Sequence, residues 1–233
     1  DFLVPKLPIY SASFLGSSGN VVVSGRRPFF YLYDSIAGKL DFVPKILGRD
    51  EKSLERCVAA PDGRTLAFCG NDGYVILYDA YNKTSMANLK MNGSVRAVCF
   101  SDNQVLASGS DGDVYRWDLR TQKCIERFSN QDGSITSSMS VSSRTLAVGA
   151  ESGVVNLYSS EESQHHQQQS PSTPYKSILN LHSSADLVRF NTDGQILALS
   201  SRREKQALKL LHVPSSTVFA NWPTFKTPLS YVW

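Results

Sequence analysis

One pattern recurs five times along this chain at intervals near forty residues, and this recurrence constrains the fold more than any other feature. In its clearest copies, which begin at Gly70, Gly109 and Gly149, a short polar turn leads into an alternating apolar run. The five runs close on Tyr33, Tyr78, Trp117, Tyr158 and His212, which are 45, 39, 41 and 54 positions apart. Repeats of this length are supersecondary units that bury their apolar faces by stacking on their neighbours.

The longest of these intervals contains an insertion. Residues 161–174 read EESQHHQQQSPSTP, and removal of these 14 residues leaves a spacing of 40. The segment has no large apolar side chain, so it cannot bury enough surface to offset the entropy of ordering it. We therefore expect a flexible polar insertion at the surface, and a metal site at His165 and His166 is the less favoured alternative.

Each full unit shows three strands. Residues 95–100 alternate with the period of two that is typical of a strand. A second strand, 105–108, leads through the turn pair Asp111-Gly112 to a third strand, 114–118. One such sheet cannot bury both of its faces alone, whereas radial stacking of several sheets buries them. Together with the Gly-x-Asp-Gly and Trp-Asp signature of WD40 repeats, this predicts an all-β fold, a WD40-type β-propeller.

The repeats also predict the domain organisation. We expect residues 1–233 to form a single propeller domain that is truncated at one or both ends. Four repeats are complete or nearly so, a partial one lies at Ser24–Asp34, and another starts at Leu229–Trp233. Propellers close by pairing their termini within one blade, as each radial sheet is called. The full protein is therefore expected to supply more sequence, for seven blades that are incomplete in this chain.

Four residues match structural positions of WD40 blades. Asp72 and Asp111 each precede the closing aromatic residue by six positions, where the pattern holds a structural aspartate, and Trp117-Asp118 is the signature dipeptide. We expect Trp117 to be buried between blades. The usual Gly-His pair is replaced by Met91-Asn92-Gly93, so the usual Asp–His hydrogen-bond chain is not expected there.

Residues that carry chemistry are scarce. The sequence has no Gly-x-Ser-x-Gly, no His-x-x-x-His and no phosphate-cradling glycine loop, so we predict no enzyme, no catalytic residue and no cofactor. No run approaches 18 apolar residues, so no membrane span is predicted. The cysteines form no Cys-x-x-Cys pair and no zinc-type spacing with histidine, which favours reduced thiols and no metal site. They are Cys57, Cys69, Cys99 and Cys124.

Basic residues gather in particular loops. Lys and Arg number 24 against 21 Asp and Glu, a net charge of only +3, so any basic surface must be local. Residues 26–27 and 202–205 occupy equivalent loops, and in WD40 propellers such loops share one face with the connections between units. The cations assigned to this rim are Arg26, Arg27, Arg49, Lys52, Arg96, Arg202, Arg203 and Lys205. They are candidates for contact with RNA phosphates or an acidic partner. Solvated charge, diluted by Glu51, Glu55 and Glu204, is the alternative.

Five segments are more specific than the repeat itself. They are Ser24-Gly25-Arg26-Arg27 running to Tyr33-Asp34, then Gly48–Glu55, Leu89–Arg96, Asp113–Arg120 and Thr217–Thr224. Together they resemble the U3 small nucleolar RNA-associated protein 18 family, WD40 subunits of the UtpB complex of the small-subunit processome. The resemblance runs over essentially the whole chain except the insertion.

The resemblance implies a non-enzymatic scaffold subunit in the nucleolus of the nucleus. The implied partners are other UtpB propeller proteins, the ribosomal RNA precursor and the U3 small nucleolar RNA. These partners form a large ribonucleoprotein that processes pre-rRNA to 18S rRNA during small ribosomal subunit biogenesis. No membrane and no small-molecule substrate is implied. A generic WD40 peptide-binding adaptor, such as a ubiquitin-ligase substrate receptor, is the alternative, and a propeller hydrolase is the least favoured one.

Overall fold

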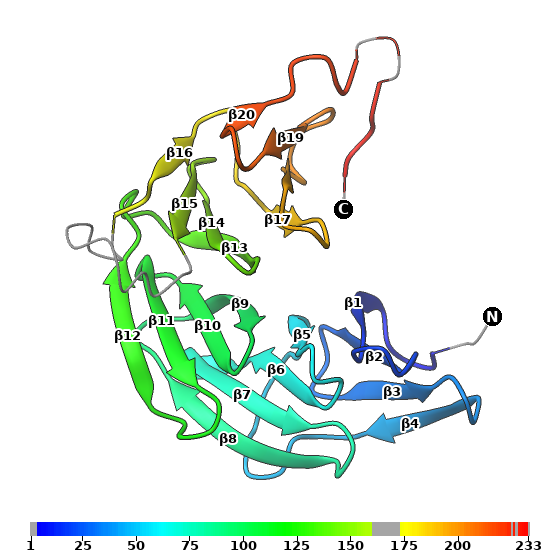
Figure 1. Ribbon diagram of the computed structural model, residues 1–233. Coiled ribbons are helices and arrows are strands. Elements are labelled where there is room, and N and C mark those ends of the chain that lie inside the picture. Colours follow the sequence, from blue (N-terminus) through cyan, green and yellow to red (C-terminus); the bar gives the residue numbers. More distant parts are fainter. Residues whose placement is uncertain (1–3, 160–172, 225, 227, 233) are drawn as a thin grey trace. The chain divides into compact units, whose positions relative to one another are not determined.

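The computed structural model describes residues 4–159, 173–224, 226 and 228–232. Their strands form five four-stranded sheets, and in each sheet strands that are consecutive in sequence are neighbours (Figure 1). The first sheet consists of β1 (Ile9–Phe14), β2 (Val21–Gly25), β3 (Phe30–Asp34) and β4 (Lys39–Val43). The second consists of β5 (Cys57–Ala59), β6 (Thr65–Cys69), β7 (Tyr74–Asp79) and β8 (Thr84–Lys90), with a 3-10 turn at Asn71–Gly73 between β6 and β7.

The remaining three sheets repeat this order. The third consists of β9 (Val95–Ser101), β10 (Gln104–Gly109), β11 (Asp113–Asp118) and β12 (Cys124–Ser129). The fourth consists of β13 (Thr136–Val141), β14 (Thr145–Ala150), β15 (Val155–Ser159) and β16 (Lys176–Ile178). The fifth consists of β17 (Leu187–Phe190), β18 (Ile196–Ser200), β19 (Leu208–His212) and β20 (Thr217–Val218). The contacts between residues divide the chain into two compact units. The first unit is residues 1–105 with 117–123, and the second is residues 106–116 with 124–233.

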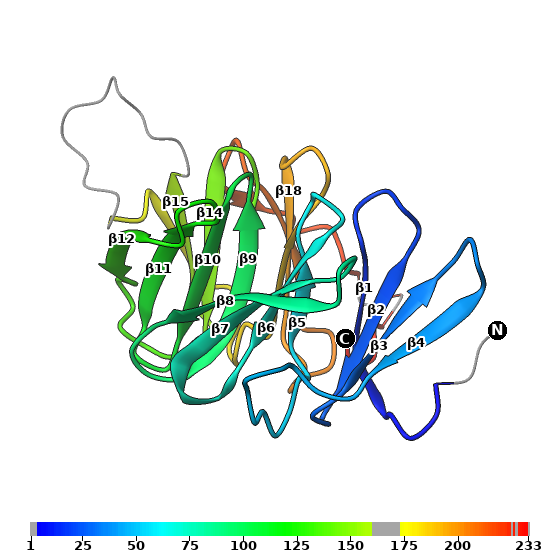
Figure 2. The same cartoon turned by 90° about the horizontal axis from the view of Figure 1, so that it is seen from below.

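In the first unit, the main core fills the space between the first and second sheets. The strands of the first sheet run side by side in order (Figure 2), so alternate residues face the second sheet. The ring of Phe30 lies 4.8 Å from that of Phe68 and 5.3 Å from that of Tyr78, measured between centroids. All three side chains are almost completely buried. Burial of a large apolar side chain stabilises a fold by roughly 1.5–3 kcal/mol, so these contacts hold the two sheets together.

The second unit has its own core between the fourth and fifth sheets. Leu197, Leu199 and Leu211 are fully buried against Ala147 and Leu157 in one apolar cluster. The Ser137 and Ser138 hydroxyls donate hydrogen bonds to the Ala185 carbonyl oxygen at 2.7 and 2.6 Å, so polar bonds also tie β13 to the connection before β17.

The three strands expected in each unit are present, but two sequence predictions were wrong. Every sheet has a fourth strand that the sequence analysis did not identify. The first repeat is a complete sheet and not a partial one, because Ile9–Phe14 forms β1 and Lys39–Val43 forms β4. The expected strand start at residue 229 is also wrong, since residues 229–232 form no strand. Of the predicted flexible insertion, residues 161–172 lie outside the described residues, so its flexibility stays a prediction.

A repeated contact joins each of two turns to the connection that follows its sheet. Gly73 has a φ of +76°, and a Cβ at this position would lie 2.3 Å from the Gly93 carbonyl oxygen. The amide of Met91 donates a 2.9 Å hydrogen bond to the Gly73 carbonyl. Gly153 has a φ of +90°, and a Cβ there would lie 2.7 Å from the Leu181 carbonyl oxygen. The turn between the second and third strands therefore needs glycine for both its conformation and its close approach.

Candidate functional site

Five of the eight cations proposed for the rim belong to the first unit, and each lies in the predicted segment. Arg26 and Arg27 follow β2, Arg49 and Lys52 lie between β4 and β5, and Arg96 is the second residue of β9. Backbone contacts join these segments at one end of the sheets. The Leu54 amide donates to the Arg27 carbonyl at 3.0 Å, and the Arg56 guanidinium donates to the Arg96 carbonyl.

We call this region the basic end. It comprises the β2–β3 loop, the β4–β5 connection, the β6–β7 turn and the β8–β9 connection with the flanking residues of β8 and β9. Its cations are Arg26, Arg27, Lys45, Arg49, Lys52, Arg56, Lys90 and Arg96. Its acidic residues are Asp50, Glu51, Glu55 and Asp72.

Two of the four carboxylates at the basic end neutralise arginines, as the alternative interpretation expected. Glu55 accepts a 2.7 Å hydrogen bond from Arg26 Nε, which raises the pKa of Arg26 through the hydrogen bond and the opposite charge. Glu51 Oε1 lies 2.5 Å from Arg49 Nη2, and the Glu51 side chain is only 3% exposed. Its other oxygen accepts a 2.5 Å bond from the Asn71 amide, so Glu51 fixes the β6–β7 turn.

Tyr74 is the central aromatic residue of this end, and the sequence analysis did not single it out. The Arg49 guanidinium carbon lies 4.1 Å from the centroid of the Tyr74 ring, and Lys90 Nζ lies 4.4 Å from it. Lys90 stands opposite Tyr74 in the β7–β8 pairing and also donates to the Asp72 carbonyl oxygen. Two cations therefore contact one partly exposed ring, an arrangement in which each is attracted by the ring quadrupole.

Several cations of the basic end have no carboxylate partner. Among the described residues no ion pair reaches the exposed side chains of Arg27, Lys45, Lys52, Lys90 and Arg96. The exposed carboxylates of Asp50 and Asp72 likewise take part in no ion pair within the described part of the chain. Solvent-exposed positive charge therefore exceeds negative charge here.

The other three proposed cations belong to the second unit, in the loop between β18 and β19 as predicted. Asp186 Oδ2 accepts a 3.0 Å hydrogen bond from the Arg202 amide, and Ser201 Oγ accepts a 3.3 Å bond from the Arg203 amide. Lys205 Nζ lies 5.6 Å from the centroid of the Tyr231 ring. The prediction that these cations share a rim with those of the first unit stays a prediction.

The proposed structural positions differ in what their side chains do. Trp117 is 3% exposed, and Asp118 Oδ1 accepts bonds from the amides of Arg120 and Thr121 at 2.7 and 3.3 Å. Burial raises the pKa of Asp111, whose carboxylate accepts long hydrogen bonds of 3.4 Å from the Asp113 amide and the Tyr115 hydroxyl. Asp72 has a φ of +55° and an exposed side chain, so it shapes the turn through its backbone.

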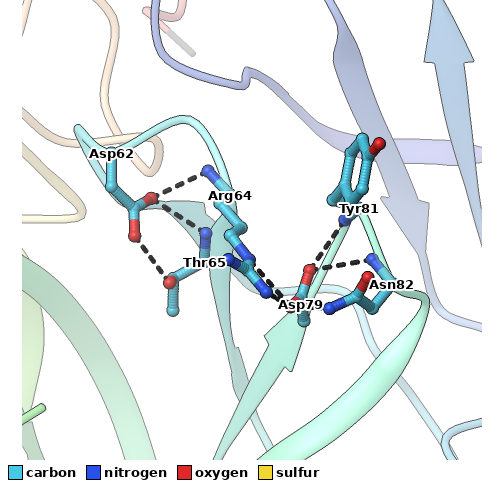
Figure 3. Close-up of polar contacts among 6 residues, drawn as sticks. All are labelled: Asp62, Arg64, Thr65, Asp79, Tyr81 and Asn82. Carbon is cyan, nitrogen blue, oxygen red and sulfur yellow. Dashed lines mark hydrogen bonds and ion pairs between the residues drawn. The ribbon is translucent and has the colours of Figure 1, made fainter. Parts of the chain in front are cut away.

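A second polar cluster braces the opposite end of the second sheet (Figure 3). The Asp79 carboxylate accepts hydrogen bonds from Arg64 and from the amides of Tyr81 and Asn82, and Asp62 accepts bonds from the Arg64 and Thr65 amides. The Arg64 side chain joins the β5–β6 turn to the end of β7, and the bonds that Asp79 accepts lower its pKa, with the Arg64 hydrogen bond the largest cause. The cluster is therefore structural and offers no free carboxylate for a ligand.

Two cysteines of the described residues are buried, and one histidine lies in a surface turn. Burial raises the pKa of the Cys57 thiol well above its usual range and that of Cys69 to about 12, which disfavours the nucleophilic thiolate. The His212 ring nitrogen lies 2.7 Å from the Ser215 hydroxyl, within a surface turn. In the described part of the chain, no group of three or more His, Cys, Asp or Glu side chains is placed to hold a metal ion. None of the described helices is long and apolar enough to cross a membrane.

Comparisons with known proteins identify the fold. The family model described as WD domain, G-beta repeat matches residues 84–118, which run from β8 to β11. A solved structure entitled Crystal Structure of Mitotic Checkpoint Complex superposes with a TM-score of 0.77 over 93% of this chain and 68% of that chain, at 15% identity. The predicted fold class, a WD40-type β-propeller, is confirmed.

Sequence relatives extend over nearly the whole chain. The Arabidopsis thaliana protein named U3 small nucleolar RNA-associated protein 18 homolog is 42% identical over 96% of this chain and 41% of its own length. The Homo sapiens protein of the same name is 36% identical over 95% of this chain and 40% of its own length. The Saccharomyces cerevisiae U3 small nucleolar RNA-associated protein 18 is 26% identical over 97% of this chain and 46% of its length. The chain thus spans about two fifths of the length of these relatives.

Proposed function

We propose that this protein belongs to the U3 small nucleolar RNA-associated protein 18 family, whose members it matches over about two fifths of their length, and that it is a non-enzymatic scaffold subunit of the small-subunit processome. In this role it associates with the U3 small nucleolar RNA and the ribosomal RNA precursor in the nucleolus. It joins other propeller proteins of the UtpB complex and supports processing to 18S rRNA.

The observation that carries the proposal is the 42% identity over 96% of the chain, which includes loops and connections as well as strands. The basic end is made of such segments. Its unpaired exposed cations suit contact with an RNA-containing particle, because phosphate contacts need positive charge without demanding a particular base sequence.

The chemistry of the site supports a scaffold rather than an enzyme. The carboxylates that are well ordered by several bonds, Glu51 and Asp79, are occupied with turns of the chain itself. The thiols of Cys57 and Cys69 are held protonated by burial. The arrangement therefore favours assembly by surface contact, and a single small-molecule site is not part of the proposal.

Affinity purification of the intact protein from nucleolar extract, followed by gradient sedimentation, tests the function. We expect the protein to sediment with large particles that contain U3 small nucleolar RNA and UtpB proteins, and RNase treatment to release it from the RNA but not from UtpB. Recovery in small complexes with ubiquitin-ligase subunits and without this RNA would refute the scaffold function and favour the peptide-binding adaptor.

A further inference from the structure

We propose that the surface around Tyr74 binds the phosphates of single-stranded RNA, with Lys90 and Lys52 as the phosphate contacts. Arg49 and Tyr74 position Lys90. The source of the RNA in this inference rests on the proposed function, whereas the side-chain contacts that support binding do not depend on it. The carrying observation is that two cations, Arg49 and Lys90, contact one aromatic ring at 4.1 and 4.4 Å while only one of them has a carboxylate partner.

The pairing of these groups leaves one positive charge uncompensated. Glu51 neutralises Arg49 and is itself buried, so its charge is not available to Lys90. Lys90 is exposed, stands at the end of β8, and donates to the carbonyl of Asp72 rather than to a carboxylate. Lys90 therefore carries a positive charge that no carboxylate compensates, and this charge attracts an anion that approaches from solvent.

The surrounding segments of the basic end carry further positive charge. The basic end carries eight cations and four acidic residues, an excess of four, whereas the whole chain has a net charge of only +3. The positive excess of this protein is therefore concentrated in these segments. An extended array of cations matches a polymer that bears one charge on every nucleotide.

The position of Lys90 is set by well-defined neighbours, which distinguishes it from a solvated lysine on a loop. Its strand pairs with β7 directly at Tyr74, and the ring holds both the ammonium group and the Arg49 guanidinium. Arg49 is in turn held by Glu51 through two contacts, of 2.5 and 2.8 Å. A preorganised cation loses less side-chain freedom when it binds, which favours binding.

The test measures binding of the intact protein to a fluorescent single-stranded oligouridylate by anisotropy over a range of salt concentrations. The variants are Lys90→Gln, Lys52→Gln and the double variant. For single strands each lost phosphate contact reduces the slope of log affinity against log salt by about 0.7, which corresponds to about four-fold weaker binding at 0.15 M salt. We expect each single variant to show this change and the double variant to show about twice the change in slope.

Two further variants separate charge from structure. Lys123→Gln removes an equally exposed lysine from the β11–β12 turn, and we expect it to leave both affinity and slope unchanged. Lys90→Arg keeps the charge and should restore the slope. Tyr74→Leu keeps every cation but removes the ring, so it should weaken binding while the salt slope stays near the wild-type value. Thermal melting of each variant shows whether the fold is retained.

The possible results of these experiments test the RNA-binding surface around Tyr74 and the proposed scaffold function separately. Wild-type affinity and slope in the Lys52→Gln, Lys90→Gln double variant, with a normal melting curve, would overturn the site while co-sedimentation with U3 RNA still supports the function. Binding of the oligonucleotide through Lys90 by a protein that does not sediment with U3 RNA would support the site and refute the function. Unchanged RNA binding together with loss of a co-purifying acidic protein would overturn the site in favour of a protein interface.

Discussion

Replacement of Asp79 by alanine tests how the strand-ending aspartates stabilise these sheets. Asp79 ends β7 and is 3% exposed. Its carboxylate accepts bonds of 2.8 and 2.5 Å from Arg64, 2.9 Å bonds from the amides of Tyr81 and Asn82, and a 2.9 Å bond from the Asn82 side chain. Asp34 ends β3 in the first sheet and provides a matched control, because within the described residues its carboxylate accepts two backbone bonds, from the amides of Ile36 and Ala37, and forms no ion pair.

The expected loss of unfolding free energy depends on which hydrogen-bond partners of Asp79 remain without a bond in the variant. A hydrogen bond to a charged group contributes roughly 1.5–3 kcal/mol, but exposed partners regain water when the carboxylate is removed. Tyr81 is 85% exposed and the Arg64 side chain is 55% exposed, so most of these partners become solvated. We therefore expect Asp79→Ala to lower the free energy of unfolding by about 2–3 kcal/mol and Asp34→Ala by about 1 kcal/mol.

Urea denaturation, followed by tryptophan fluorescence, measures both values at pH 7. A loss for Asp79→Ala no greater than that for Asp34→Ala would refute the argument, because it would mean that Arg64 and Asn82 add nothing to the turn. The pH dependence gives an independent check. The Arg64 hydrogen bond, followed by the backbone bonds from Asn82 and Tyr81, lowers the pKa of Asp79 against the opposing effect of burial.

A carboxyl group whose pKa is lower in the folded protein stabilises it at pH values above the unfolded pKa, about 3.9. This stabilisation is lost as the pH falls through the folded pKa. The difference in unfolding free energy between wild type and Asp79→Asn should therefore be largest near pH 7 and shrink below about pH 4. A difference that grows as the pH falls would contradict the assignment.

Three other substitutions probe the core, a turn and the predicted rim. Trp117→Ala should lower the unfolding free energy by about 3–5 kcal/mol, because the side chain is buried; a variant that melts like wild type and only loses partners would contradict this. Gly73→Ala should shift the urea midpoint further than Gly38→Ala, since a Cβ at Gly73 meets backbone at 2.3 Å whereas one at Gly38 meets nothing within 4 Å. Charge reversal at Arg202 and Arg203 should weaken crosslinking to RNA while UtpB association persists, and loss of UtpB without a change in crosslinking would make this loop a protein-binding site.

The sequence predicted the strands whose apolar residues alternate or run together, and it missed the fourth strand of each sheet. Residues 105–108 of β10 are almost fully buried, so their apolar run is plain. In β8 exposed and half-buried residues alternate, and Met86 is 46% exposed. An outer strand is paired on one side only, and its side chains carry little of the apolar contrast on which a periodicity argument depends. The same weakness hid β1, which has Ile9 and Phe14 exposed at its ends.

The candidate site could be predicted only in part, for a related reason. Arg49 and Lys52 were assigned because loop position alone places them at one end of the sheets. Lys90 and Tyr74 were missed because their contact depends on the pairing of β7 with β8, and β8 was not recognised. Nor does any sequence spacing indicate that Arg49, from an irregular connection, lies over the Tyr74 ring. Pairwise contacts of this kind depend on tertiary structure.

The glycine turns packed against the following connections have a consequence for protein engineering. Where Gly73 and Gly153 touch backbone, the chain has no room for added residues. The turn between β3 and β4 differs, because Ile36 is 90% exposed and Gly38 is surrounded by open space. The 14-residue polar segment found in the sequence follows β15, in the equivalent turn of the fourth sheet. An affinity tag or a fluorescent reporter is therefore best inserted between Ile36 and Gly38. The equivalent connection after β15 already carries additional residues in this sequence.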